Sequence, residues 1–210
     1  MQFIYLHGFA SSPKSVKVQY LRERFATLQI DLKVPDLNQG DFSQLTMTRQ
    51  LRQVEAEFTS NTVPVTVIGS SFGGLTAAWL GQQLQVQRLV LLAPAFQFLS
   101  QWYRALGEEK LKRWQAEQYL MVYHYGEKRS LPLSYEFILN AAQYRDEELL
   151  RPIPTLILHG CQDDVIPIQA SRDFARERPW VELIELDSDH ALGNVLPEIW
   201  SAIRVFCQLP

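Results

Sequence analysis

A serine between two glycines, where an apolar run meets a helix-like run, is the clearest chemical feature of the sequence. The β-branched run 65–68 ends abruptly in Gly69-Ser70-Ser71-Phe72-Gly73, and the residues that follow have the composition of a helix. This pattern predicts a strand, a sharp turn and a helix, with Ser71 raised above the end of a sheet. The flanking glycines leave room for the close backbone approach that such a turn requires. Ser71 is therefore the candidate nucleophile.

The same turn has other readings. A glycine- and serine-rich turn between a strand and a helix can instead bind phosphate at the helix N-terminus. Nucleotide binding has little support, because residues 69–74 contain neither a phosphate-loop lysine nor Gly-x-Gly-x-x-Gly spacing. A serine at position 71 also excludes an aspartate nucleophile there.

A serine hydroxyl needs a neighbouring base, and the base needs an acid that orients it. Asp163 and Asp164 follow the apolar run 155–160, and His190 follows the run 181–186. The order serine, acid, histidine is the one expected after a strand, turn and helix of this kind. His190 is predicted to be the general base, and the residues alone leave Asp163 and Asp164 both open as the acid.

The remaining histidines, and the aspartates beside His190, are weaker candidates for catalysis. His7 and His159 each end a strand just before a glycine, which favours a role in fixing those loops. His124 lies in an aromatic-rich segment that is expected to cover the site, so contact with substrate is an alternative for it. Asp187 and Asp189 are interpreted as loop-forming or solvated.

A developing oxyanion needs two backbone N–H donors. One is expected from the residue after the nucleophile, Phe72, and the other from the loop after the first strand. Phe9 is the best candidate for the second donor.

Apolar runs alternate with amphipathic stretches along most of the chain. Strands are predicted at 3–6, 30–34, 65–68, 88–93, 155–160 and 181–186, and helices at about 18–28, 43–60, 75–80, 169–178 and from 197 onward. This alternation predicts a doubly wound, mostly parallel α/β sheet of about six strands. With the strand order 2-1-3-4-5-6, the ligand would lie beyond the ends of the strands that finish at Leu6 and Ile68, beside Ser71.

Residues 95–150 interrupt this alternation. We expect no strand there, two or three helices, and a helical cap over the strand ends. The segment holds 11 of the 24 aromatic residues, counted from the sequence. These side chains could line an apolar acyl or alcohol pocket, or they could simply pack the cap onto the core.

Length and composition set the remaining bounds. The 210 residues suit one domain spanning 1–210. The net charge of −3, with dispersed charges, argues against a nucleic-acid partner. From the sequence we expect neither a signal peptide nor a membrane span. Cys161 and Cys207 are the two cysteines, which fits a reducing compartment, and we expect a cytoplasmic protein.

The chain resembles α/β-hydrolases over its whole length and, more closely, the small bacterial esterases of the YqiA type. The resemblance rests on the opening 5–15 and on the elbow 69–74. The motif Tyr125-Gly126-Glu127 and the neighbourhoods of residues 163–165 and 189–191 are also similar.

This resemblance implies an α/β-hydrolase fold and a serine esterase that cleaves small-molecule carboxylic esters, or thioesters, through an acyl-enzyme without metal or cofactor. It favours Asp163 over Asp164 and implies the catalytic triad Ser71, Asp163 and His190, with Phe9 and Phe72 as the oxyanion donors. The long cap and Cys161-Gln162 in the acid loop depart from the family pattern. The alternative function is a non-catalytic ligand-binding or partner-binding protein that retains the fold, and covalent reactivity of Ser71 would separate the two.

Overall fold

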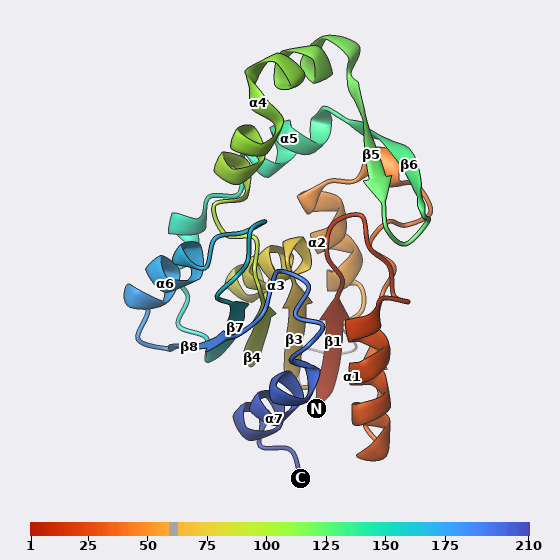
Figure 1. Cartoon of the computed structure of the whole chain (residues 1–210). Helices are drawn as coiled ribbons and strands as arrows, with labels where there is room; N and C mark the ends of the chain where they lie inside the picture. The colour runs from red at the N-terminus through yellow and green to blue at the C-terminus, as the bar shows by residue number, and fades with distance from the viewer. Residues whose placement is uncertain (59–62) are drawn as a thin grey trace.

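A parallel β-sheet forms the centre of the molecule (Figure 1). The structure is a computed structural model, and it describes residues 1–58 and 63–210. The strand order is β2-β1-β3-β4-β7-β8, and each neighbouring pair is parallel. The strands are β1 (Gln2–Leu6), β2 (Leu32–Lys33), β3 (Val65–Ser70), β4 (Arg88–Leu92), β7 (Thr155–Gly160) and β8 (Val181–Leu186). This confirms the predicted parallel sheet of about six strands, and the order is the one assumed from the sequence, with the reversal between β1 and β3.

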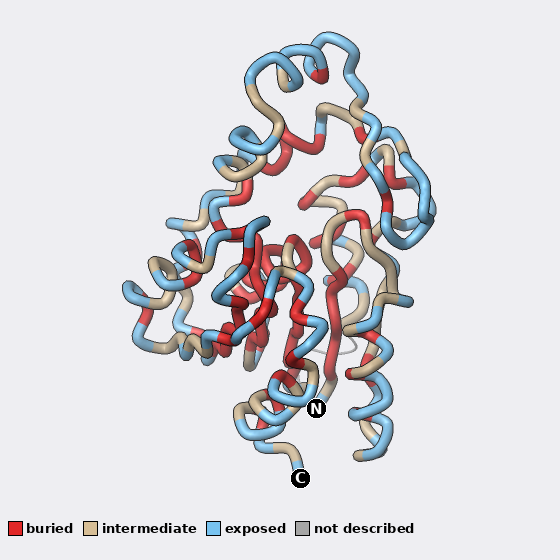
Figure 2. Tube along the Cα trace, viewed as in Figure 1, coloured by how far each residue is buried: buried red, intermediate tan, exposed pale blue. Residues whose placement is uncertain are grey.

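Helices pack on both faces of the sheet because the strands are apolar on both sides. Alternate residues of β1 show this: Ile4 belongs to one buried cluster and Phe3 to the other. The face of Phe3 is covered by α1 (Val16–Thr27) and α7 (Leu196–Cys207), and the face of Ile4 by α2 (Met47–Glu55), α3 (Phe72–Gln83) and α6 (Gln169–Arg176). Figure 2 shows the buried residues concentrated along the strands. Among the described residues, no helix has the length and apolar character needed to cross a membrane.

The predicted helix 43–60 is divided in the structure. A 3₁₀ turn, η1 (Phe42–Gln44), precedes α2, and the Thr46 side chain accepts a hydrogen bond from the Arg49 N–H. This N-cap starts a new helix after the turn. Thr59 and Ser60, the last residues of the predicted helix, lie outside the described residues.

The expectation that residues 95–150 contain no strand is wrong. The segment comprises α4 (Phe98–Glu117), β5 (Tyr119–His124), β6 (Arg129–Ser134), α5 (Glu136–Ala141) and η2 (Asp146–Glu148). The strands β5 and β6 pair as an antiparallel hairpin. Exposed and less exposed residues alternate along β5, which is the two-residue period of a strand. The aromatic residues of this run therefore lie on a strand and not on the expected helix.

We call residues 95–150 the cap segment, since Figure 1 shows it above the carboxyl ends of the parallel strands. Gly107, with φ 74° and ψ 162°, breaks α4 into two parts. The turn of the hairpin reaches down to the loop after β1, where the Tyr125 N–H donates to the Ala10 carbonyl at 2.8 Å. The cap segment is therefore tied to the loop that carries Phe9.

Candidate active site

The turn between β3 and α3 is a strained elbow at Ser71. This residue has φ 54° and ψ −120°, a conformation that costs a non-glycine residue about 1–3 kcal/mol. A Cβ on Gly69 would collide with the Gly73 carbonyl, and a Cβ on Gly73 would collide with the carbonyls of Leu6 and His7. Both glycines are thus required by close backbone contacts, as the sequence pattern predicts.

His190 lies between Ser71 and Asp163. Its Nε2 is 3.0 Å from Ser71 Oγ, and its Nδ1 is 2.7 Å from Asp163 Oδ2. An ionised carboxylate can only accept, so Nδ1–H donates to Asp163 and Nε2 is left to accept from the Ser71 hydroxyl. The structure brings together the three residues that the sequence singles out for nucleophilic chemistry.

The two neighbouring carboxylates of the acid loop have different surroundings. The Asp163 side chain is fully buried, and its Oδ1 accepts from the N–H groups of Val165 at 2.9 Å and Ile166 at 2.8 Å. Burial raises the pKa of Asp163, but hydrogen bonds from His159 and His190, with the charge of His190, outweigh burial and hold this pKa well below its usual value. Asp164 is exposed. Asp163 is therefore the ionised acceptor beside His190.

The loop after β1 runs beside the elbow. A Cβ on Gly8 would lie 3.3 Å from the Ser71 Cβ, and Phe9 is the next residue. Within the described chain, neither the Phe9 nor the Phe72 backbone N–H has a hydrogen-bond partner. Phe72 opens α3, where N–H groups lack partners inside the helix. Both groups are available as oxyanion donors, and that role stays a prediction.

His7 and His124 hold loops. The buried His7 donates from Nδ1 to the Gly8 carbonyl at 3.0 Å and accepts at Nε2 from the Leu37 N–H at 3.0 Å. His124 is buried in the hairpin and accepts at Nδ1 from the Glu127 N–H at 3.1 Å. Neither ring is hydrogen-bonded to the serine, the acid or the histidine of the site.

The acid loop is residues 161–168, between β7 and α6, and the histidine loop is residues 187–195, between β8 and α7. The two loops are joined by hydrogen bonds. The Gln162 backbone N–H donates to the Ser188 carbonyl at 3.0 Å, and the Gln162 side-chain amide donates to Asp187 Oδ1 at 2.7 Å. Asp189 accepts from the Ala191 N–H at 2.9 Å and so closes the turn around the histidine. Both aspartates are loop-forming, as expected, and Gln162 links the two loops.

Three side chains in or next to the site were not assigned to it from the sequence. His159 Nε2 lies 3.0 Å from Asp163 Oδ2, Ser171 Oγ lies 2.8 Å from His159 Nδ1, and Lys17 Nζ lies 2.9 Å from the Ala191 carbonyl oxygen. The four-residue spacing of His159 and Asp163 after one strand is a signal that could have indicated the first contact. Lys17 gave no signal, because 174 residues separate it from its partner.

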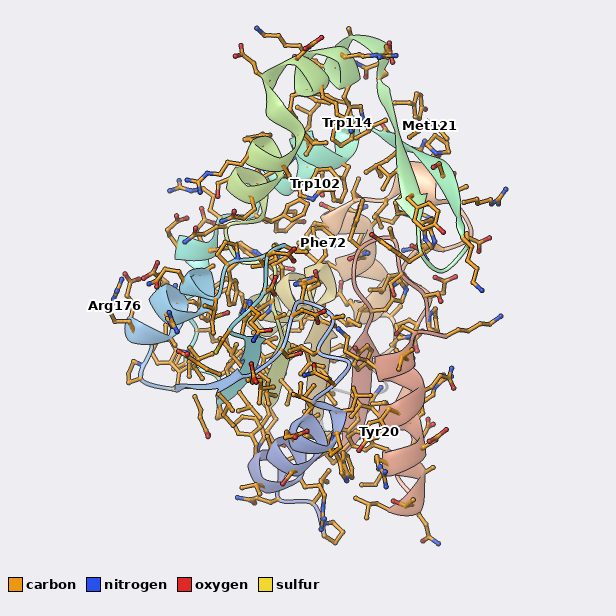
Figure 3. All side chains as sticks on the ribbon, viewed as in Figure 1. Tyr20, Phe72, Trp102, Trp114, Met121 and Arg176 are labelled. Carbon is orange, nitrogen blue, oxygen red and sulfur yellow. The ribbon has the colours of Figure 1, made fainter. Side chains whose placement is uncertain are left out.

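Aromatic side chains connect the cap segment to the elbow. Trp102 in α4 packs edge-on against Phe9 at 5.1 Å between ring centroids, and Phe98 lies 4.9 Å from Phe72. Figure 3 shows the Trp102 and Phe72 side chains in the region between α4 and α3. Part of the aromatic content of the cap segment therefore packs it onto the sheet, while Phe9 and Trp102 stay partly exposed.

A cleft of about 420 Å³ lies between the cap segment and α6. Its walls include Leu75, which is one helical turn beyond the elbow serine, and the aromatic residues Phe96, Phe98 and Phe174. The volume falls in the range of small-molecule pockets. Ser71 and His190 are not part of its lining. Elsewhere, no group of three or more His, Cys, Asp or Glu side chains among the described residues is arranged to hold a metal ion.

The parallel sheet, the strained serine elbow after β3, and the acid and histidine loops after β7 and β8 together define the α/β-hydrolase fold. Within this fold, the chain belongs to the family described as "Uncharacterised protein family (UPF0227)", which it matches over residues 2–207. No curated protein sequence matches the chain.

Solved structures support the fold at low sequence identity. Mouse alpha/beta hydrolase domain-containing protein 10 is 21% identical, with a TM-score of 0.80 over 99% of this chain and 89% of that one. Est1E from Butyrivibrio proteoclasticus, solved with ferulic acid bound, is 20% identical, with a TM-score of 0.81 over 99% of this chain and 88% of that one. The pyrethroid hydrolase PytH is 19% identical, with a TM-score of 0.70 over 100% and 98%.

Proposed function

We propose that this protein is a serine esterase that hydrolyses carboxylic esters, or thioesters, of small to medium acyl chains through an acyl-enzyme. One observation carries the proposal: Ser71 Oγ lies 3.0 Å from His190 Nε2, and His190 is bonded through Nδ1 to the buried Asp163. A serine hydroxyl facing an imidazole acceptor, with an acid behind the imidazole, is the arrangement of an activated nucleophile.

Acylation would begin at Ser71. Its Oγ attacks the acyl carbonyl carbon as the hydroxyl proton passes to His190 Nε2, and the Phe9 and Phe72 N–H groups stabilise the oxyanion. When the tetrahedral intermediate collapses, the bond to the leaving oxygen or sulfur breaks and that atom takes the proton from His190. The products of this half-reaction are an ester on Ser71 and a free alcohol or thiol.

Deacylation repeats these steps with water. His190 accepts a proton from water as the water oxygen attacks the acyl carbon, and it returns the proton to Ser71 Oγ when the acyl bond breaks. Asp163 stays ionised throughout, because its low pKa keeps it an acceptor that stabilises the imidazolium. The free acid is released and Ser71 is regenerated.

The surroundings of the elbow suit an apolar substrate. Phe9, in the loop beside the elbow, and Trp102, which packs against it, are both partly exposed. The names of two similar structures, Est1E and a pyrethroid hydrolase, are consistent with an ester substrate.

The test is the intact mass of the protein after exposure to a fluorophosphonate, for the native chain and for Ser71→Ala. We expect one phosphonyl adduct on the native chain and none on the variant, followed by turnover in a series of p-nitrophenyl esters of increasing acyl length. We expect Ser71→Ala to keep the fold, because Ser71 is a partly exposed residue and loss of its hydroxyl leaves no large cavity.

No adduct on the native chain and no ester turnover would overturn the proposal in favour of a binding protein that retains the fold. Equal labelling of the native chain and Ser71→Ala would show that the fluorophosphonate reacts with a residue other than Ser71. The circular dichroism spectrum of the variant serves as the control for folding.

A further inference from the structure

His159 is a buried titratable side chain in direct contact with the proposed orienting acid. It is fully buried in β7, and its Nε2 lies 3.0 Å from Asp163 Oδ2 and 2.9 Å from the Ile166 carbonyl oxygen. A carbonyl oxygen can only accept, so Nε2 must carry a proton. Asp163 Oδ2 therefore receives hydrogen bonds from two imidazoles, His159 on one side and His190 on the other.

The second ring nitrogen of His159 is also engaged. Its Nδ1 lies 2.8 Å from the hydroxyl of Ser171, a fully buried residue of α6. In a neutral imidazole protonated on Nε2, Nδ1 can only accept, so the Ser171 hydroxyl donates to it. The tautomer is set at Nε2 by two groups that can only accept, the Ile166 carbonyl and the Asp163 carboxylate, and the Ser171 hydrogen bond holds the ring in place from its other side.

Asp163 accepts four hydrogen bonds, two on each oxygen. The Val165 and Ile166 N–H groups fix Oδ1, which leaves the orientation of Oδ2 to the two histidines. Without the His159 donor, the carboxylate could rotate, and Oδ2 would keep His190 as its single partner. A change of that kind misaligns the imidazole with Ser71, and small misplacements of reacting groups are costly in rate.

We propose that His159 is a positioning residue for the hydrolytic reaction, aligning Oδ2 of Asp163 with His190 Nδ1, and that Ser171 holds the His159 ring in place for this task. The inference rests on the proposed function, since His159 acts through Asp163 and His190. It assigns to His159 a role beyond fixing its own loop.

Three variants separate this role from a structural one. His159→Phe removes both ring nitrogens and with them the contacts to Asp163, Ile166 and Ser171, His159→Gln keeps an amide N–H that can reach Asp163, and Ser171→Ala removes the bond that holds the ring from its other side. The first readout is the second-order rate of Ser71 labelling by a fluorophosphonate, which needs no knowledge of the natural substrate. We expect His159→Phe to lower this rate by up to about 100-fold, with His159→Gln recovering part of the loss and Ser171→Ala falling between Phe and the native chain.

The second readout is the ¹H NMR signal of the proton between His190 Nδ1 and Asp163 Oδ2, which is strongly deshielded in such a hydrogen bond. We expect the signal to move in His159→Phe and to stay closer to its native position in His159→Gln. With a p-nitrophenyl ester, the loss should be in kcat with KM unchanged, because His159 does not touch substrate.

Thr155→Val is the matched control. It removes a buried hydroxyl that donates to the Ile153 carbonyl at 2.8 Å, at the opposite end of the same strand. We expect the native labelling rate in this variant even if its melting temperature falls. A loss of rate in Thr155→Val equal to that in Ser171→Ala would overturn the proposal, because it would follow from lower stability alone.

A folded His159→Phe with the native rate and an unmoved signal would also overturn it. If His159→Phe does not fold, native rates in both His159→Gln and Ser171→Ala, with unmoved signals, would have the same meaning. If Ser71 of the native chain does not react at all, the proposed function fails, and the position of the His190 signal in the variants still decides whether His159 sets the Asp163 hydrogen bond.

Discussion

Lys17 and Ala191 are 174 residues apart in the chain, yet the Lys17 ammonium donates a 2.9 Å hydrogen bond to the Ala191 carbonyl. Lys17 lies in α1, and Ala191 directly follows His190. Burial lowers the pKa of Lys17 to about 8, against the attraction of Asp163 and Asp189, which raises it. The partly buried Lys17 amine thus joins α1 to the residue that follows His190, which couples the helix to the position of the histidine.

Lys17→Met should therefore lower turnover. The variant keeps much of the side-chain volume but removes the donor to the Ala191 carbonyl, which frees the histidine loop. We expect kcat to fall about 10-fold with little change in KM, because a loosened general base is aligned less often with Ser71. Initial rates with a p-nitrophenyl ester at pH 7 measure this.

Lys17→Arg is the matched variant, since a guanidinium can still donate to the carbonyl. It should retain more activity than the Met variant. Equal, native-like kcat in both would show that the Asp189 turn holds the loop without help from α1.

The two neighbouring aspartates should respond very differently to the same substitution. In Asp163→Asn, the amide nitrogen would face the N–H groups of His159 and His190, so His190 would be driven away from the tautomer that accepts from Ser71. We expect kcat to fall by about 10⁴-fold, as in triads that lose the orienting carboxylate. The exposed Asp164→Asn should stay within about twofold of the native value, since it removes no buried interaction. A larger loss in Asp164→Asn would reverse the assignment.

The elements that carry the site follow strong local patterns, which is why they could be predicted. The elbow has a glycine on each side of Ser71, and the strands are near-continuous apolar runs whose alternation with helices indicates a parallel sheet. The hairpin β5-β6 was missed because its run Tyr119–His124 is aromatic and apolar throughout, and burial alternates along it only after the cap segment packs. Contacts such as Lys17 to Ala191 depend on tertiary packing across the sheet, and no local spacing encodes them.

The elbow glycines should be intolerant of a single methyl group. Gly69→Ala places a Cβ against the Gly73 carbonyl and the Cα of Gly74, backbone atoms that cannot rotate away. We expect the free energy of unfolding to fall by about 1–3 kcal/mol or more, and labelling of Ser71 to slow, because the elbow must open. Urea unfolding at pH 7 measures the first effect.

Gly193→Ala is the matched control for that substitution. A Cβ at this position has no heavy atom within 4 Å, so the change should leave stability the same or slightly raise it by restricting the unfolded chain. If Gly69→Ala is as stable as Gly193→Ala, the elbow has more freedom than its backbone contacts indicate.

Asp146 gives a prediction for the pH dependence of stability. Burial raises its pKa to about 6, although a hydrogen bond from the Gln97 N–H lowers it. Between the unfolded value near 4 and about 6, the folded state binds more protons than the unfolded state, so this group makes stability fall as pH rises. Asp146→Asn removes the titration while an amide oxygen can still accept from Gln97. Relative to the native chain, the variant should gain about 2 kcal/mol in the free energy of unfolding between pH 4 and pH 7. Urea unfolding of both proteins at the two pH values measures the difference, and a constant difference would contradict the raised pKa.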